Sequence, residues 1–441
     1  MRGSSVSSLF VFNPTLKPAW PHPTEEDYTL CKLMYYYPET APSYEMQSHV
    51  GLAEGLGMFV SQFSSNPLES IHTEKHTHIL YQCEPNLYVC IVLQHNTQGE
   101  GFIRQQDLET HPELLQQIAQ AYYKNFYLFH GPLRNFAYPQ DIPVLKTLLS
   151  DYTAAFLYEQ STKEDPFEGF YYCPLDRKVY MFVVFLLTQL SSAYPEIQHI
   201  MLTYEGYLVS TTLPQSAALI LYNYFSRNKQ WKKISSFKRE PSPNACQYAR
   251  SFSYPKKGFL YGKQDQIVNT PIVHLEGCEP MKLVTWCQDS LQLVLLLRNT
   301  EINIGVLDAL SALLESTSED LISAIMPQHQ RASMQEDNFR FIYFNMMNLA
   351  IKQSTRLTTI DDNLYRLITT LSAQMKETNN KTDALVKTLI RTHTAWVLAL
   401  KTLESREIYV ILPPSTAPAN RVEEEITRFV SHYFHNIFTG I

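Results

Sequence analysis

Short apolar runs separated by polar residues recur along the chain, most clearly in residues 336–441. Residues 339–345, FRFIYFN, alternate in the manner of a half-buried strand and end in a turn that contains Asn345 and Asn348. Asparagine tolerates the left-handed backbone angles that such a turn needs. The pattern then predicts a strand at 349–353, an amphipathic helix from 364 to 375, strands at 384–391, 395–400 and 407–412, and a helix from Asn420.

The same order of elements recurs twice upstream. In the middle third, strands at 199–204 and 207–212 flank Glu205-Gly206, a two-residue hairpin signal. The pattern of this middle third also predicts a leading helix at 176–194, strands at 271–275, 282–287 and 291–297, and a helix at 303–325. In the first third, the pattern predicts strands at 8–13, 30–37, 76–83 and 87–93, and helices at 50–63, 108–129 and 142–158. A weak fifth strand is predicted near Phe102. We therefore expect an α+β protein with three tandem modules, each an antiparallel sheet flanked by helices.

The amino-acid composition excludes some classes of protein and favours others. The net charge of −7 argues against a general nucleic-acid binder. The seven cysteines form no CxxC pair, which favours unpaired thiols in a reducing compartment. The longest apolar run, at 179–187, is about half of a membrane span. We expect a soluble, intracellular protein whose membrane contact is peripheral.

Recognisable catalytic patterns are missing from the sequence: GxSxG, GxxxxGK[ST] and HExxH do not occur. One stretch, IHTEKHTH at 71–78, is rich in histidine. His72 and His76 would share a helix face, whereas His76 and His78 would share a strand face, and three such side chains are able to bind zinc. A polar strand face or loop is the simpler interpretation, so we predict no metal and no cofactor.

The predicted helix HVGLAEGLGMFVSQF, at 49–63, carries three glycines, each of which costs about 1 kcal/mol relative to alanine. Its expected core side consists of Leu52, Leu56, Phe59, Val60 and Phe63. A second stripe, made of Gly51, Gly55, Met58 and Gln62, lies about 100° around the helix. This stripe either packs closely on the module's own sheet or is a docking face for another protein.

A basic stretch at 227–263 contains ten Lys or Arg residues and a single acid, Glu240. Aromatic residues are interleaved with these charges, a combination that suits the surface of an anionic membrane. A solvated loop and RNA binding are the alternatives, and the acidic remainder of the chain weakens the second. The membrane-binding candidates are Trp231, Lys232, Lys233, Lys238, Arg239, Lys256 and Lys257.

Several stretches, in order along the chain, resemble the vacuolar fusion protein family called Ccz-one. They are FNP at 12–14, HVGLAEGLGMFVSQF at 49–63, ESIHTEK at 69–75, FRFIYFNMMNLAIK at 339–352, REIYVIL at 406–412 and HNIF at 435–438. The resemblance implies three longin domains, which we assign to 1–160, 161–335 and 336–441. The first departs from the longin plan in its Pro-rich connection, and the second in its basic insertion.

The resemblance also implies a function. Proteins of this family pair with a Mon-type three-longin subunit, and the heterodimer is a guanine-nucleotide exchange factor for the late-endosomal and vacuolar Rab GTPase of the Rab-seven class. It acts on late endosome and vacuole or lysosome membranes, in endosome maturation, vacuole fusion and autophagy. In the family the first helix of the first longin domain lies at the GTPase platform. The positions expected to contact the GTPase or the partner are Gly51, Glu54, Gly55, Met58, Ile71 and Glu74.

Three hypotheses follow for the activity. The first is an exchange-factor subunit, which needs no covalent step and hence no nucleophile. The second is a longin-domain trafficking scaffold or adaptor that leaves nucleotide release unchanged. The third is an enzyme with an unrecognised site that uses His72 and His76.

Overall fold

The computed structural model divides the chain into two compact units. The first contains the described residues up to 161 together with 228–234 and 273–279, and the second contains those of 167–227, 257–259, 270–272 and 280–434. The structure describes residues 5–18, 21–65, 67–94, 112–136, 138, 140–161, 167–234, 257–259, 270–298, 304–334, 340–354, 362–379, 386–402, 405–413 and 418–434.

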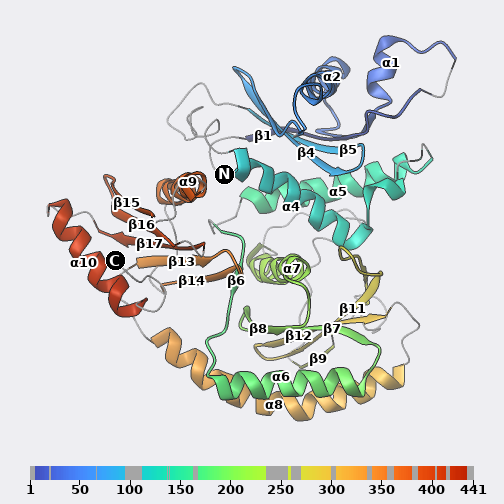
Figure 1. The fold of residues 1–441 in the computed structure, drawn as a ribbon. Coiled ribbons are helices and arrows are strands. Elements are labelled where there is room, and N and C mark those ends of the chain that lie inside the picture. Colours follow the sequence, from blue (N-terminus) through green and yellow to red (C-terminus); the bar gives the residue numbers. More distant parts are fainter. Residues whose placement is uncertain are drawn as a thin grey trace. The chain divides into compact units, whose positions relative to one another are not determined.

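The first unit is built on a five-stranded antiparallel sheet with the strand order β2-β1-β5-β4-β3 (Figure 1). Its strands are β1 (Ser5–Phe12), β2 (Leu33–Tyr37), β3 (Ser70–His72), β4 (His76–Glu84) and β5 (Leu87–Gln94). Its helices are α1 (Glu25–Leu30), α2 (Ser43–Ser61), α4 (Pro112–His130) and α5 (Ile142–Ser161), with a 3-10 turn, η1 (Leu133–Phe136).

Alternation along β1 divides the core of this unit into two layers. Phe10 and Phe12 point toward α2, whereas Leu9 and Val11 point toward α4 and α5. The predicted strands and helices of this module are therefore present, but the fifth strand is β3. The expected position near Phe102 lies outside the described residues.

The second unit contains two sheets, of which the first has the order β10-β11-β12-β7-β8, with β9 beside β11. Figure 1 shows α6 and α8 on one face of this sheet and α7 on the other. The elements are α6 (Arg177–Ala193), β7 (Ile197–Tyr204), β8 (Tyr207–Thr211), α7 (Gln215–Ile234), β9 (Lys257–Phe259), β10 (Ile272–Val273), β11 (Met281–Gln288), β12 (Leu291–Arg298) and α8 (Ile304–Met334). The hairpin at Glu205-Gly206 is confirmed, since both residues have positive φ angles of 50° and 89°.

The other sheet has the order β15-β16-β17-β13-β14-β6. Helix α10 packs on one of its faces and α9 on the other. The elements are β13 (Arg340–Asn345), β14 (Ala350–Gln353), α9 (Asp362–Asn379), β15 (Val386–Arg391), β16 (Trp396–Lys401), β17 (Arg406–Leu412) and α10 (Ala419–Tyr433). The predicted α+β plan, with antiparallel sheets flanked by helices, is confirmed.

Strand β6 (Phe170–Tyr171) departs from that plan, because it precedes the second sheet in the chain but pairs in parallel with β14 of the last sheet. The next residues reach the second sheet, where the Cys173 amide donates to the Leu208 carbonyl at 2.8 Å. Gly169 permits the approach, since a Cβ there would collide with the Leu349 carbonyl oxygen.

The turn after β13 corrects a detail of the sequence prediction. Leu349 has the positive φ angle, 54°, and neither asparagine does. The asparagine side chains accept backbone hydrogen bonds instead: Asn345 Oδ1 from the Met347 amide at 3.0 Å, and Asn348 Oδ1 from the Ala350 amide at 3.1 Å.

None of the helices in the described part of the chain combines the length and apolarity that a membrane crossing requires.

Candidate functional site: the outer face of helix α2

Helix α2 turns an apolar surface away from its sheet. We call this surface the outer face; it consists of Tyr44, Gly51, Gly55, Met58, Phe59 and Phe63, the last of which lies just beyond the helix. Met58 and Phe59 are each 58% exposed and Phe63 is 74% exposed. The rings of Phe59 and Phe63 contact each other with centroids 5.0 Å apart.

The glycines of α2 are open. No atom of another element lies within 4 Å of the position that a Cβ would take at Gly51 or Gly55. The interpretation that the stripe packs on the module's own sheet is therefore wrong. A helix backbone without side chains lets another chain approach closely. We therefore keep the second interpretation, in which this stripe is a docking face for another protein.

The predicted core side of α2 is also wrong in part. The buried residues are His49, Val50 and Ala53, whereas Phe59 and Phe63 are exposed. Leu52 and Leu56 are partly buried at the border. The helix is apolar around most of its circumference, so hydrophobic periodicity alone did not show which side faces the sheet.

The other predicted contact residues take different places. Glu54 receives two hydrogen bonds from Lys32 Nζ, at 2.6 and 2.8 Å, which tie α2 to the start of β2. Ile71 is buried in the core layer beneath α2, and Glu74 is exposed in the turn between β3 and β4. The outer face is thus made by α2 and the residues that follow it, while Ile71 supports the helix from below.

Histidines line the inner side of α2. His76 and His78 lie on β4, so the strand interpretation of this stretch is correct, and His49 of α2 joins them. The ring centroids are 5.2 Å apart for His49 and His78, 6.2 Å for His49 and His76, and 6.3 Å for His76 and His78. The Tyr36 hydroxyl lies 2.8 Å from His49 Nδ1. Sequence spacing had not linked His49 to the other two, because the sheet and the helix bring them together.

Burial lowers the pKa of two of these histidines. The pKa of His78 falls to about 4, mainly through burial and with smaller contributions from the nearby His49 and His76. The pKa of His49 is also lowered by burial. His72 points elsewhere: it is exposed on β3 and lies 3.1 Å from the Thr77 hydroxyl. Among the residues that the structure describes, no group of three His, Cys, Asp or Glu side chains has the arrangement of a metal site.

The membrane-binding candidates are only partly described. Trp231, Lys232 and Lys233 lie at the end of α7, and nothing is described of their side chains. Lys238, Arg239 and Lys256 lie outside the described residues. Lys257 begins β9 and makes an ion pair with Glu315 at 3.4 Å. The expectation that this stretch binds a membrane stays a prediction.

The described cysteines form no disulfide with one another: Cys31, Cys83, Cys90, Cys173, Cys278 and Cys287. Burial raises the pKa of Cys83 and Cys173 to about 12 in each case. A thiol must lose its proton to act as a nucleophile, so neither is suited to catalysis near neutral pH.

Comparison with known proteins agrees with this architecture. A family model described as the first longin domain of INTU, CCZ1 and HPS4 matches residues 6–131, which contain the first sheet. A model described as Intu longin-like domain 3 matches residues 335–429, which contain every strand of the last sheet except β6.

Relatives match nearly the whole chain. The vacuolar fusion protein CCZ1 homologue of Xenopus tropicalis is 23% identical over 98% of this chain and 97% of its own length. The homologue of Danio rerio is 24% identical over 98% and 95%, and that of Dictyostelium discoideum is 23% identical over 92% and 93%. Two separate parts of the chain therefore match longin-domain models, and the chain as a whole is similar to the vacuolar fusion protein CCZ1 homologues along almost its full length.

Proposed function

We propose that this protein acts in vacuolar trafficking, as one subunit of a heterodimeric guanine-nucleotide exchange factor. Its partner is a Mon-type three-longin protein, and its target is a late-endosomal or vacuolar Rab GTPase of the Rab-seven class. The relatives' shared description as vacuolar fusion proteins supports the trafficking role. The exchange activity and both partners come from the family resemblance.

The observation that carries the proposal is the outer face of α2. Exposed large apolar groups next to bare helix backbone form the kind of surface that a protein partner covers. Met58 and Phe59 supply apolar contact area, while Gly51 and Gly55 allow the partner to approach the helix axis. The buried layer of Val50, Ala53 and His49 holds this helix on the sheet.

Exchange at such a surface needs no reacting side chain. An exchange factor binds the GTPase more tightly in its open, nucleotide-free form, and this difference in affinity shifts the population toward that form. Switch loops change between ordered and disordered states as they lose contact with phosphate and magnesium, so a surface that holds them open is sufficient. In this proposal the chain works on the cytoplasmic side of late endosomes and vacuoles as a peripheral protein. The basic residues at 227–263 contribute the attraction to anionic or phosphoinositide-containing lipid.

The test is a nucleotide-release assay. This chain is co-expressed with a Mon-type subunit from the same organism, and the Rab is loaded with a fluorescent GDP analogue. We expect the pair to accelerate release and each chain alone to be inactive. An intact pair that leaves release unchanged would overturn the exchange-factor proposal and favour the scaffold hypothesis.

Leucine variants then locate the contact. Gly51→Leu and Gly55→Leu place bulk on the outer face, where the free helix has room for it. Gly57→Leu is the matched control, because Gly57 also has open space but lies on a different side of the helix. We expect at least a tenfold loss of exchange for the first two and little change for the control. Loss of co-purification would assign the face to the partner subunit, and loss of exchange by an intact pair would assign it to the GTPase.

A further inference from the structure

Strand β2 is an edge of the first sheet, and it pairs only with β1 among the described strands. Every second residue of an edge strand points its N–H and C=O groups away from the sheet. Edges of this kind bind an added strand unless another element covers them.

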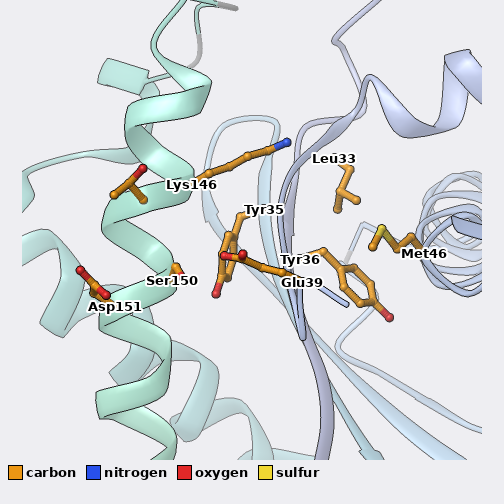
Figure 2. Close-up of a pocket in the computed structure, with 9 residues that line it drawn as sticks. Leu33, Tyr35, Tyr36, Glu39, Met46, Lys146, Ser150 and Asp151 are labelled. Carbon is orange, nitrogen blue, oxygen red and sulfur yellow. The ribbon is translucent and has the colours of Figure 1, made fainter. Parts of the chain in front are cut away.

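A cavity of about 540 Å³ lies along this edge, within the range typical of ligand pockets. Figure 2 shows it between β2, α5 and α2. Its walls are supplied by Leu33, Tyr35, Tyr36, Glu39, Met46, Lys146, Thr147, Ser150 and Asp151.

The two sides of the cavity differ in chemistry. Toward α5 it is polar, because Thr147, Ser150 and Asp151 follow one another along that helix. Toward α2 it is apolar, with Leu33 and Met46 beside the ring of Tyr36, as Figure 2 shows. Since successive side chains of a strand point to opposite faces, a strand added to β2 would direct alternate side chains into these two environments.

Tyr35 adds a second observation. Its side chain is 1% exposed and lines the cavity on the α5 side, yet its hydroxyl has no hydrogen-bond partner among the residues that the structure describes. Ser150 and Thr153 lie near enough to influence the phenol, but neither is in hydrogen-bonding geometry with it. A buried hydroxyl without a partner is costly, and a bound group that accepts a hydrogen bond from it would remove that cost.

We propose that the open edge of β2 binds an extended peptide strand whose alternate side chains are apolar toward α2 and hydrogen-bonding toward α5. The main chain of the peptide supplies affinity by pairing with β2, and the two sides of the cavity select its pattern. This site is separate from the outer face of α2 and does not depend on nucleotide exchange.

The test uses a fluorescein-labelled peptide of three Thr-Val repeats and measures fluorescence anisotropy with the full chain. Two further peptides carry N-methyl groups, one on every Thr nitrogen and the other on every Val nitrogen. Because the N–H groups of alternate residues point to opposite edges of a strand, one methylated peptide should lose binding and the other should keep it. Failure of the unmethylated peptide to bind, or equal binding by the two methylated forms, would overturn the proposal.

Protein variants test whether the peptide binds in this cavity. Tyr35→Phe removes only the hydroxyl, and we expect about fivefold weaker binding without a lower unfolding temperature. Tyr37→Phe is the matched control on the same strand, outside the cavity lining. Thr147→Trp places bulk in the polar side from an exposed helix position and should abolish binding in a folded protein. Unchanged binding by both Tyr35→Phe and Thr147→Trp would assign the peptide to another surface.

Discussion

Helices α2 and α10 each cover one face of a longin sheet, but they use their apolar residues differently. In α10 Val422, Ile426, Phe429 and Val430 are buried, and the exposed aromatic residue Tyr433 stands at the end of the helix. In α2 the largest apolar side chains, Met58 and Phe59, point away from the sheet. Helix α10 therefore buries most of its apolar surface against its own sheet, whereas α2 leaves much of its apolar surface exposed.

The inner sides of these helices differ as well. The inner side of α10 is aliphatic and aromatic, and it packs on Phe341, Leu398 and Val410. The inner side of α2 includes His49, which lies among histidine and tyrosine rings. A helix whose outer surface binds another protein still needs a stable attachment, and here a partly polar layer provides it.

The largest expected effect is at the buried phenylalanine of α10. Phe429 is 3% exposed, so Phe429→Ala should lower the free energy of unfolding by about 4 kcal/mol, through lost burial and the cavity that remains. Urea denaturation of the full chain measures this change. A loss below about 1 kcal/mol would mean that α10 is loosely attached, and the contrast with α2 would fail.

Acidification should weaken the attachment of α2. The pKa of His78 is about 4 in the folded chain and near 6.5 when unfolded, so the unfolded chain binds more protons between these values. The stability contributed by neutral His78 is present above about pH 6.5 and is lost as the pH falls toward 4. We expect a loss on the order of 2 kcal/mol across this window.

The groups that face His78 are His49 and His76, and Glu45 also acts on His49. The control is His78→Phe, which keeps a ring but cannot titrate. The stability of this variant should depend less steeply on pH than that of the wild type. Some dependence should remain, because the pKa of His130 is also lowered to about 4. If the free energy of unfolding fell equally steeply with pH in both proteins, His78 would not be a residue that takes up a proton on unfolding.

Filling a glycine on the outer face should stabilise the chain. Gly55→Ala adds a methyl group in open space and improves helix propensity, so the free energy of unfolding should rise by about 1 kcal/mol. Gly169→Ala is the opposing control, since its Cβ would meet the Leu349 carbonyl and should destabilise the chain. Destabilisation by Gly55→Ala, measured by urea titration, would mean that the outer face is covered in the free protein.

The smallest expected effect is at the exposed phenylalanine of α2. Phe59→Ala should change the free energy of unfolding by less than about 0.5 kcal/mol, because its ring is 58% exposed. The same variant should impair exchange by the co-expressed pair if the outer face is the docking surface. Normal exchange together with normal stability would limit the docking surface to the glycine stripe.

Regular periodicity made much of the fold predictable. The strands around Glu205-Gly206 and the helix carrying Ile426 and Phe429 were assigned correctly, because their apolar residues recur at one period with a clear polar side. Several features escaped prediction. Strand β3 is three residues long, β6 pairs with a sheet that is remote in sequence, and His49 meets His78 only through packing of α2 on β4.

The candidate site was predictable in part. The glycines of α2 and their separation from Leu52 and Leu56 follow from helical geometry. Which side of the helix faces the sheet does not, because residues 49–63 are apolar on both sides. For the same reason the exposure of Phe59 and Phe63 was not foreseen.

By itself, the sequence determined the α+β plan, the order of most strands and helices, and the resemblance to the longin family. Local periodicity and turn chemistry carry this information, since each depends on neighbouring residues. Only the tertiary structure decided that, within the described part of the chain, the outer face of α2 is open, the Tyr35 hydroxyl lacks a partner and β2 pairs on one side alone. Each of these depends on which remote segments pack together, and a residue's burial is a property of that packing rather than of its position in the chain.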